Sequence, residues 1–328
     1  MMKNPVKTSS VKKMNFGDIY SKYGVMMILA VIFIVASVLS KNFLTQANLT
    51  NVLRQIVVIT ILGFGGTFVL ISAQINIAYD ALIAAIGCLA CITMVRTGSV
   101  ILSVILGILI GALIGWGYGF LLTFFNIPAF IVGLAINTIA RGAILMITGG
   151  RNISKLGDFS IIGQGYIGPV PIPVIIMFVL LFICWIILNK TCFGRHVFAV
   201  GGNPAAAEAS GINVNSIIRK VYLLDGIMTA IAAIIFMSRL ASGQPSAGDG
   251  YAFDAITAAV VGGASISGGA GNVMGTIIGA AIVGVINNLM NLMNISSYWQ
   301  QIVKGIIILL AVIVDVQTKK ATSKARKD

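Results

Sequence analysis

The chain contains a series of apolar runs that approach or exceed the length of a membrane-spanning helix. A helix needs about 20 apolar residues to cross the roughly 30 Å hydrocarbon core of a bilayer. Only 9% of the residues are charged and 58% are hydrophobic, whereas about a quarter of the residues of a soluble domain are charged. These properties exclude an ordinary soluble domain and predict an all-α, polytopic membrane protein.

Ten membrane helices are predicted where apolar runs are separated by polar, Gly or Pro clusters. They lie at residues 24–40, 52–72, 78–95, 99–124, 128–148, 170–189, 217–238, 252–263, 272–291 and 299–316. The eighth is too short to span a bilayer alone. The predicted organisation is a basic N-terminus at 1–23, a transmembrane domain at 24–316 with a cytoplasmic loop at 190–216, and a basic tail at 317–328.

The placement of the basic residues predicts the orientation. Most of them lie in the two ends of the chain and around the loop after the sixth helix: Lys3, Lys7, Lys12, Lys13, Lys22, Lys190, Arg195, Arg219, Lys220, Lys319, Lys320, Lys324, Arg326 and Lys327. Basic loops remain in the cytoplasm, and an even number of crossings puts both termini on one side. We therefore expect a multi-pass protein of the cell (inner) membrane, surrounded by lipid, with both termini cytoplasmic. This pattern explains the net charge of +13 without a nucleic-acid partner.

Two parts of the chain resemble each other. The motif Tyr79-Asp80-Ala81 has a counterpart in Phe253-Asp254-Ala255. Downstream of the two motifs, glycines recur every fourth residue, at Gly107, Gly111, Gly115 and Gly119 and at Gly271, Gly275 and Gly279. Further on, Arg141-Gly142 matches Lys304-Gly305. Because the matched helices lie five crossings apart, the pattern predicts an inverted 5+5 repeat, which is typical of transporters. Chance similarity between Gly- and Ala-rich membrane helices is the alternative.

Motifs for catalysis are absent from the sequence. No G-x-x-x-x-G-K-[ST] phosphate loop is present, and the single His196 and single Glu208 provide neither a zinc motif nor paired catalytic carboxylates. Cys88 and Cys91 form an isolated C-x-x-C inside an apolar run, where small buried cysteines are the simpler explanation. We therefore expect a protein that is not an enzyme and that binds no metal or cofactor.

Polar residues at membrane depth are candidates for a solute pathway, because such groups usually face a bundle interior or a water-filled cavity. The charged ones are Asp80, Arg141, Asp225, Asp254, Lys304 and Asp315, of which Asp315 lies at the cytoplasmic end of the last helix. We expect Arg141 and Asp225 to pair inside the bundle, either as part of the pathway or as a structural bridge. The predicted pathway residues are Asn76, Asp80, Asn137, Arg141, Asp254 and Asn287. Hydrogen bonding between helices is the alternative role of the asparagines.

The predicted cytoplasmic loop contains a short Ala-rich helix. Asn203 is a suitable N-cap, Pro204 suits the first helical position and Gly211 ends the helix. A small helix of this kind suits docking into a groove of another protein.

At this loop the sequence resembles permease subunits of bacterial ABC importers of the ribose, xylose and galactose type, which are related to the branched-chain amino acid permeases. The pattern of that family is matched at Gly194, Arg195, Ala199, Gly201, Asn203, Ala206, Ala207, Ser210, Gly211 and Ile212. Further matches lie at residues 138–142, 148–151, 254–256, 261–263, 267–269 and 271–276 and at Asn287.

The resemblance implies an architecture similar to the vitamin-B12-type importers. It implies a homodimer or heterodimer of permeases, a separate ABC ATPase subunit that holds ATP and magnesium, and an extracytoplasmic substrate-binding protein. Coupling to the ATPase would involve Gly194, Arg195, Gly201, Asn203, Ala206, Ala207, Glu208, Ser210 and Gly211. The implied solute is a monosaccharide, either a ribose-like pentose or a hexose. A nucleoside, a sugar derivative or a branched-chain amino acid remains an alternative, as does an ion-coupled secondary transporter.

The chain departs from this family before the third helix. Similar permeases usually carry G-I-D-L-S-V-G-S there, whereas this chain has Gln-Ile-Asn-Ile-Ala-Tyr-Asp-Ala at 74–81. Asn76 replaces the usual acid, and Asp80 provides one four residues later. Since residues four apart share a face of a helix, we expect Asp80 to take over part of the missing acid's role.

Overall fold

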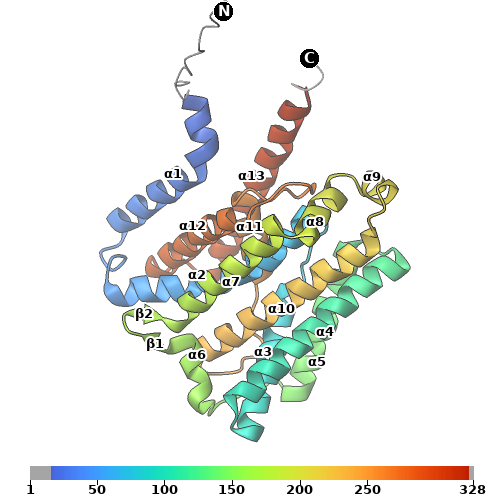
Figure 1. Ribbon diagram of the computed structural model, residues 1–328. Helices are drawn as coiled ribbons and strands as arrows, with labels where there is room; N and C mark the ends of the chain where they lie inside the picture. The colour runs from blue at the N-terminus through green and yellow to red at the C-terminus, as the bar shows by residue number, and fades with distance from the viewer. Residues whose placement is uncertain (1–15, 325–328) are drawn as a thin grey trace, which may run out of the picture.

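The computed structural model describes residues 16–324, and Lys3, Lys7, Lys12, Lys13, Arg326 and Lys327 lie outside this range. The chain folds almost entirely into helices (Figure 1). The long helices are α1 (Phe16–Leu39), α2 (Gln46–Ile71), α3 (Tyr79–Thr97), α4 (Val100–Phe125), α5 (Ala129–Thr148), α7 (Ile172–Lys190), α10 (Val214–Leu240), α12 (Val273–Leu292) and α13 (Ser297–Lys324). The shorter elements are η1 (Gly157–Ser160), α6 (Ile161–Gln164), α8 (Cys192–Gly202), α9 (Pro204–Ala209), α11 (Tyr251–Val261) and the antiparallel strands β1 (Tyr166–Ile167) and β2 (Val170–Pro171).

Each of the ten predicted membrane segments contains a helix. Within residues 16–324, seven helices are long and apolar enough to cross a bilayer, namely α2, α3, α4, α5, α7, α10 and α12. The other three segments are apolar over shorter stretches, Gly24–Leu39, Tyr251–Val261 and Tyr298–Leu310. The prediction of an all-α polytopic membrane protein is confirmed. The short eighth segment is confirmed as well, because α11 has 11 residues.

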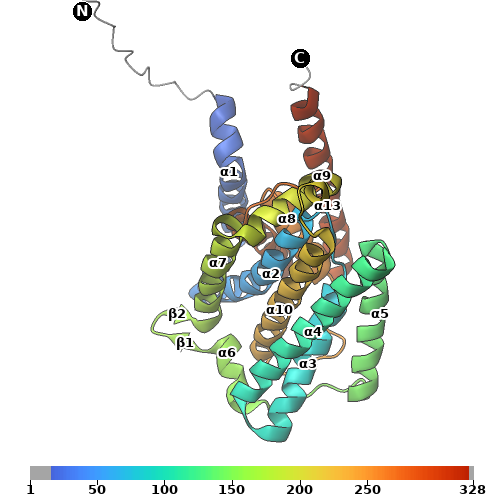
Figure 2. The same ribbon diagram turned by 45° about the vertical axis from the view of Figure 1, so that its right-hand side comes forward.

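Helices α2 and α10 form the centre of the bundle. They pack against each other, α2 also contacts α11 and α12, and α10 also contacts α3 and α4. Most residues of both helices are buried, whereas few residues of α5 are. α5 lies at the edge of the bundle in Figure 2.

Several of the glycines spaced four apart lie where two backbones touch, whereas Gly107 and Gly271 face side chains. A Cβ atom at Gly115 of α4 would lie 2.2 Å from the carbonyl oxygen of Tyr222 on α10, and one at Gly279 of α12 would lie 2.0 Å from that of Ala258 on α11. A side chain at either of these two positions would push the helices apart, so these glycines permit close helix packing.

The two sides of the bundle carry different features. The first residues of α1 and the last residues of α13 lie on the same side as α8 and α9 (Figures 1 and 2). The β1–β2 hairpin and the α3–α4 connection lie on the opposite side.

The connection between α2 and α3 is not helical although much of it is buried. Ser72, Asn76 and Ala78 are almost completely inaccessible, and Ala73 has a φ of 58°. Irregular backbone at membrane depth is tolerated only inside protein or along a cavity. Residues 72–78, called the α2–α3 segment below, are therefore a candidate functional element.

Candidate functional site: two polar clusters beside the α2–α3 segment

The first cluster surrounds the carboxylate of Asp225 on α10, whose exposed fraction is 1%. Asn76 donates its Nδ2 to Asp225 Oδ2 at 2.7 Å, and Tyr79 donates its hydroxyl to Asp225 Oδ1 at 2.7 Å. Asn76 Oδ1 accepts the backbone N–H of Ala78 at 2.8 Å. A Cβ atom at Gly65 of α2 would lie 2.3 Å from Asp225 Oδ1, so the absence of a side chain there makes room for the carboxylate.

Two stacked tyrosines support this cluster. The rings of Tyr118 on α4 and Tyr222 on α10 lie 4.3 Å apart. Tyr222 donates its hydroxyl to the carbonyl oxygen of Ile75 at 3.0 Å, and Tyr118 donates to that of Ala129 at 3.0 Å. Asn137 on α5 donates to the carbonyl oxygen of Ile77 at 3.2 Å. The bonds to Ile75 and Ile77 satisfy carbonyls of the α2–α3 segment, which helical backbone bonding leaves free.

The expected pairing of Arg141 with Asp225 is wrong. Arg141 on α5 points to the loop before α11, where its Nη1 donates to the carbonyl oxygens of Pro245 and Ala247 at 2.8 and 2.9 Å. Its Nη2 lies 2.7 Å from Asp249 Oδ1 and 3.3 Å from the carbonyl oxygen of Asp80. A planar guanidinium with five N–H groups can bind several oxygens at once, and a loop with free carbonyls supplies them.

The second cluster surrounds the N-terminal end of α11. Asp80, in the first turn of α3, accepts the backbone N–H groups of Gly250 at 3.1 Å and Ala252 at 2.7 Å. These N–H groups have no partner within α11 because they lie at its first turn. Asp80 therefore caps α11 from another helix, and a carboxylate at this end is favoured by the helix dipole.

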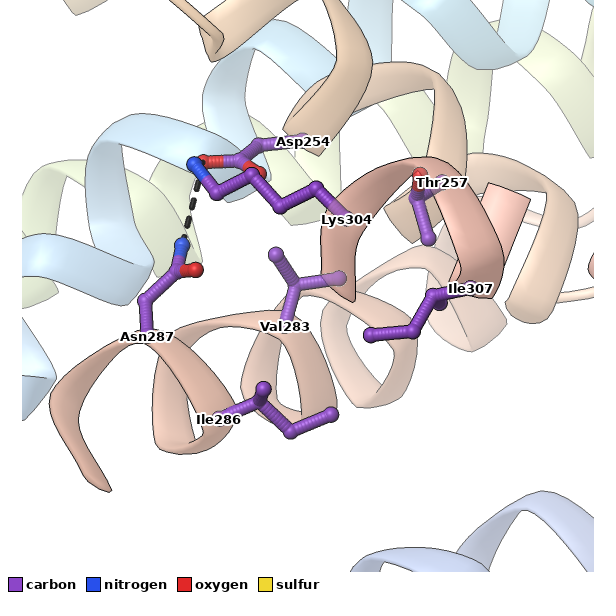
Figure 3. A pocket seen from close by; sticks show the side chains of 7 residues that line it. All are labelled: Asp254, Thr257, Val283, Ile286, Asn287, Lys304 and Ile307. Carbon is purple, nitrogen blue, oxygen red and sulfur yellow. Dashed lines mark hydrogen bonds and ion pairs between the residues drawn. The ribbon is translucent and has the colours of Figure 1, made fainter. Parts of the chain in front are cut away.

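Asp254, Lys304 and Asn287 complete this cluster (Figure 3). Lys304 Nζ on α13 lies 2.9 Å from Asp254 Oδ2, and Asn287 on α12 donates its Nδ2 to the same oxygen at 3.1 Å. The three side chains border a cavity of about 10 Å³, which is roughly the space of one water molecule. Asp254 is buried, so Lys304 balances a charge that lipid and protein would otherwise leave uncompensated.

The structure thus divides the six predicted pathway residues between two places. Asp80, Arg141, Asp254 and Asn287 lie around the N-terminal end of α11, whereas Asn76 belongs to the α2–α3 segment and Asn137 binds it. The geometric reason for linking Asn76 to Asp80 is wrong. α3 begins only at Tyr79, so the two residues do not share a helix face.

Sequence reasoning did not select Tyr79, Tyr118, Tyr222 or Asp249 as site residues. Tyr79 belongs to the repeated motif and carried a usable signal. The other three carry none, because their partners are backbone carbonyls or side chains far away in the chain. In the described part of the chain, no group of three or more His, Cys, Asp or Glu side chains is placed to hold a metal ion.

The local structure of the predicted coupling helix is confirmed. In α9, Asn203 Oδ1 accepts the N–H of Ala206 at 3.0 Å, Pro204 is the first residue, and Gly211 follows with a φ of 82°. Ala207 faces the protein, while Ala206 and Glu208 are exposed.

Of the remaining predicted coupling residues, Gly194, Arg195 and Ser210 make contacts within α8 and α9, and Gly201 contacts another helix. The N–H of Gly194 donates to Thr191 Oγ1 at 3.1 Å, and Ser210 Oγ donates to the carbonyl oxygen of Ala206 at 2.8 Å. Arg195 lies beside Cys192, with 2.8 Å between Nη2 and Sγ. Gly201 is buried against the end of α2.

The bundle, its polar clusters at membrane depth and its exposed Ala-rich helix define a membrane transport protein. Residues 48–312 match the family described as the permease component of branched-chain amino acid transport systems, and the chain belongs to this family. It is a transport permease and not an enzyme.

Several relatives match along nearly their full length. The chain is 40% identical to a ribose import permease protein of Bacillus subtilis, over 96% of this chain and 98% of that protein. It is 36% identical to an L-arabinose transport system permease protein of Escherichia coli, over 94% of each. It is 32% identical to a xylose transport system permease protein of Haemophilus influenzae, over 91% of this chain and 96% of that protein. No solved structure matches the chain significantly.

Proposed function

We propose that this chain forms the translocation pathway of an ABC importer for a monosaccharide, with a ribose-like pentose or a hexose as solute. An extracytoplasmic binding protein delivers the sugar, and a separate subunit binds ATP and magnesium and hydrolyses the ATP. The observation that carries this proposal is the 40% identity to a ribose import permease over 96% of the chain. The permeases named for arabinose and xylose support a sugar over a nucleoside or an amino acid.

The pathway is proposed to run along the edge of the second cluster. This edge is accessible, because the side chain of Asp249 is 80% exposed and those of Arg141 and Lys304 are 22% and 20% exposed. Such groups are costly in lipid unless they meet water or a partner, and sugar hydroxyls bind carboxylate, amide and guanidinium groups. Asn76 and Asn137 act on the pathway indirectly, by holding the α2–α3 segment.

The inverted 5+5 repeat is part of the proposal, and helix contacts support it. In the repeat, α2 corresponds to α10, α3 to α11, α4 to α12 and α5 to α13. The contact between α10 and α4 then has its counterpart in the contact between α2 and α12. In the same way, the contact between α10 and α3 corresponds to that between α2 and α11, and the contact between α3 and α5 corresponds to that between α11 and α13. In this scheme α1, α11 and α13 complete ten membrane segments, and both termini lie in the cytoplasm with α9. The membrane domain then comprises residues 24–316 and its coupling loop residues 190–216, between basic ends at 1–23 and 317–328.

A second permease, either another copy or a homologous chain, is proposed to cover α5. This helix packs mainly on α3 and α4, and its outer face is apolar. Beside it lies a cavity of about 360 Å³ between α3, α4 and α5, with an almost wholly apolar lining. Cross-linking from cysteine tests this arrangement. Met146→Cys on α5 should yield a cross-linked pair, whereas Val38→Cys on α1 should not, although both native side chains are 79% exposed.

Transport by the reconstituted complex tests the sugar assignment. The chain is purified with the ABC ATPase that co-elutes from native membranes and placed in vesicles with the co-encoded binding protein. Uptake of labelled ribose, xylose and arabinose is measured with and without ATP. ATP-dependent uptake of at least one sugar is expected, and uptake that needs an ion gradient but no ATPase would support the secondary transporter instead.

An α9 variant tests the contact with the ATPase. Ala206→Arg places a long cation on the exposed side of α9 and should abolish transport and ATPase binding while leaving thermal stability unchanged. Asn215→Arg adds the same charge at an exposed position in the first turn of α10 and serves as the control. Normal transport by Ala206→Arg would refute the docking role.

A further inference from the structure

Three backbone segments meet without intervening side chains where α2 ends. The N–H of Gly269 donates to the carbonyl oxygen of Ile71 at 2.9 Å. A Cβ atom at Gly201, near the end of α8, would lie 1.6 Å from this same oxygen and 2.9 Å from Gly269 N. No residue with a side chain fits at position 201 unless α8 moves away from α2.

Gly268, on the third segment, is also closely packed. A Cβ atom at Gly268 would lie 2.5 Å from the carbonyl oxygen of Gly201 and 2.6 Å from the Cβ of Ala73. Gly268 and Gly269 have φ values of 80° and 74°, and Ala73 has a φ of 58°, a region that residues with a side chain rarely adopt. We call residues 71–73, 201 and 268–269 the glycine junction.

The glycine junction is connected to both polar clusters. Beyond Ala73, the α2–α3 segment leads to Asn76 and Tyr79, which hold Asp225, and to Asp80, which caps α11. After the C-terminal end of α11, the connection to α12 at residues 262–272 contains Gly268 and Gly269. α11 is therefore tied at its beginning to the first turn of α3, and just after its end to the end of α2.

On the side of the bundle that carries α9, α8 continues almost directly into that helix. Only Asn203 separates the two helices, and Phe193 of α8 stacks on Phe68 of α2 with 6.5 Å between ring centroids. A displacement of α9 cannot be absorbed by a flexible side chain at the glycine junction, because close-packed backbone atoms transmit strain.

We propose that Gly201 is a positioning residue for transport, through which movement of α8 and α9 reaches the α2–α3 segment and α11 together. This inference rests on the proposed function, in which an ATPase moves α9. The consequence is that both polar clusters change when the ATPase closes, although neither touches the ATPase.

A pair of glycine variants tests this role in the complete complex with the ATPase and the binding protein. Gly201→Ala should lower ATP-dependent sugar uptake by about tenfold or more, the scale of a typical coupling energy, while ATP hydrolysis continues. Gly202→Ala is the matched control, because it is the next residue of the same helix and its Cβ would meet no atom within 4 Å. Equal uptake by the two variants would overturn the proposal.

Hydrogen exchange in the unmodified complex provides a second test that does not depend on the folding of Gly201→Ala. Peptides covering residues 70–80 and 262–272 should change their exchange rates when the ATPase is trapped with ATP and vanadate, whereas peptides from the α3–α4 connection should not. Unchanged exchange at residues 70–80 in a complex that still couples hydrolysis to uptake would overturn the role of the glycine junction alone. Absence of ATP-dependent uptake in the unmodified complex would instead overturn the proposed function.

Discussion

Asp225 places a buried carboxylate directly against the amide of Asn76, with 2.7 Å between Oδ2 and Nδ2. The resemblance to sugar permeases leads one to expect an acid at position 76, and here Asn76 at that position binds an acid of α10. The hydrogen bonds of this pair would survive an exchange of the two side chains. An aspartate at position 76 could still accept the N–H of Ala78, and an asparagine at position 225 could still accept the hydroxyl of Tyr79.

Single and double variants of this pair should therefore differ. Asn76→Asp puts two carboxylates together, with no basic side chain paired to Asp225 among residues 16–324, and should cost about 3 kcal/mol of stability. Asp225→Asn should also destabilise, because two amides then face each other. The double exchange should recover most of the loss in thermal unfolding of the purified chain. Losses that simply add in the double variant would contradict this account.

Lys304 should be required only while Asp254 is charged. Lys304→Met removes the cation 2.9 Å from a buried carboxylate and should cost about 3 kcal/mol. Adding Asp254→Asn should restore most of the stability, because the introduced amide has no charge to balance and its oxygen still accepts from Asn287. Thermal unfolding measures both effects, and Lys304→Arg is the control that keeps the charge. A double variant no more stable than Lys304→Met would count against the ion pair.

Asp80 should stabilise the beginning of α11 far more than its neighbour Asp249 does. Asp80→Asn replaces one accepting oxygen by an NH₂ group that faces a backbone N–H, which should cost about 1–3 kcal/mol. Asp249→Asn breaks a largely exposed ion pair with Arg141 and should cost less than about 1 kcal/mol. Hydrogen exchange of residues 249–255 should increase in the first variant only. Equal effects of the two substitutions would show that the capping bonds matter little.

An added methyl group should disrupt the contact between α4 and α10 at Gly115 but not at Gly117. Gly115→Ala would place a Cβ atom 2.2 Å from the carbonyl oxygen of Tyr222 and should cost about 1–3 kcal/mol through overpacking. Gly117→Ala meets no atom within 4 Å, and should stabilise α4 by about 0.5–1 kcal/mol because Ala is the better helix former. Thermal unfolding distinguishes the two, and a stable Gly115→Ala variant would contradict close backbone packing.

The α2–α3 connection could be predicted only in part from the sequence. The hydropathy pattern placed a helix at 78–95, and α3 indeed begins at Tyr79. The pattern could not reveal that much of residues 72–78 is buried without being helical, because the carbonyls of Ile75 and Ile77 are satisfied by Tyr222 and Asn137 from distant helices. Such partners cannot be predicted from the neighbouring residues in the sequence.

The class of fold, the positions of the helices and the local structure of α9 follow from the amino-acid sequence alone. The length of an apolar run is set by the thickness of the bilayer, and the capping by Asn203 and Gly211 depends on neighbouring residues only. The partners of the polar side chains inside the bundle and at its edge follow only from the packing of the helices, which pairs Asn76 with Asp225 and Arg141 with Asp249. The reason is physical: a buried charge takes whichever partner the packed helices bring within hydrogen-bond distance, and that distance is set by contacts between residues far apart in the chain.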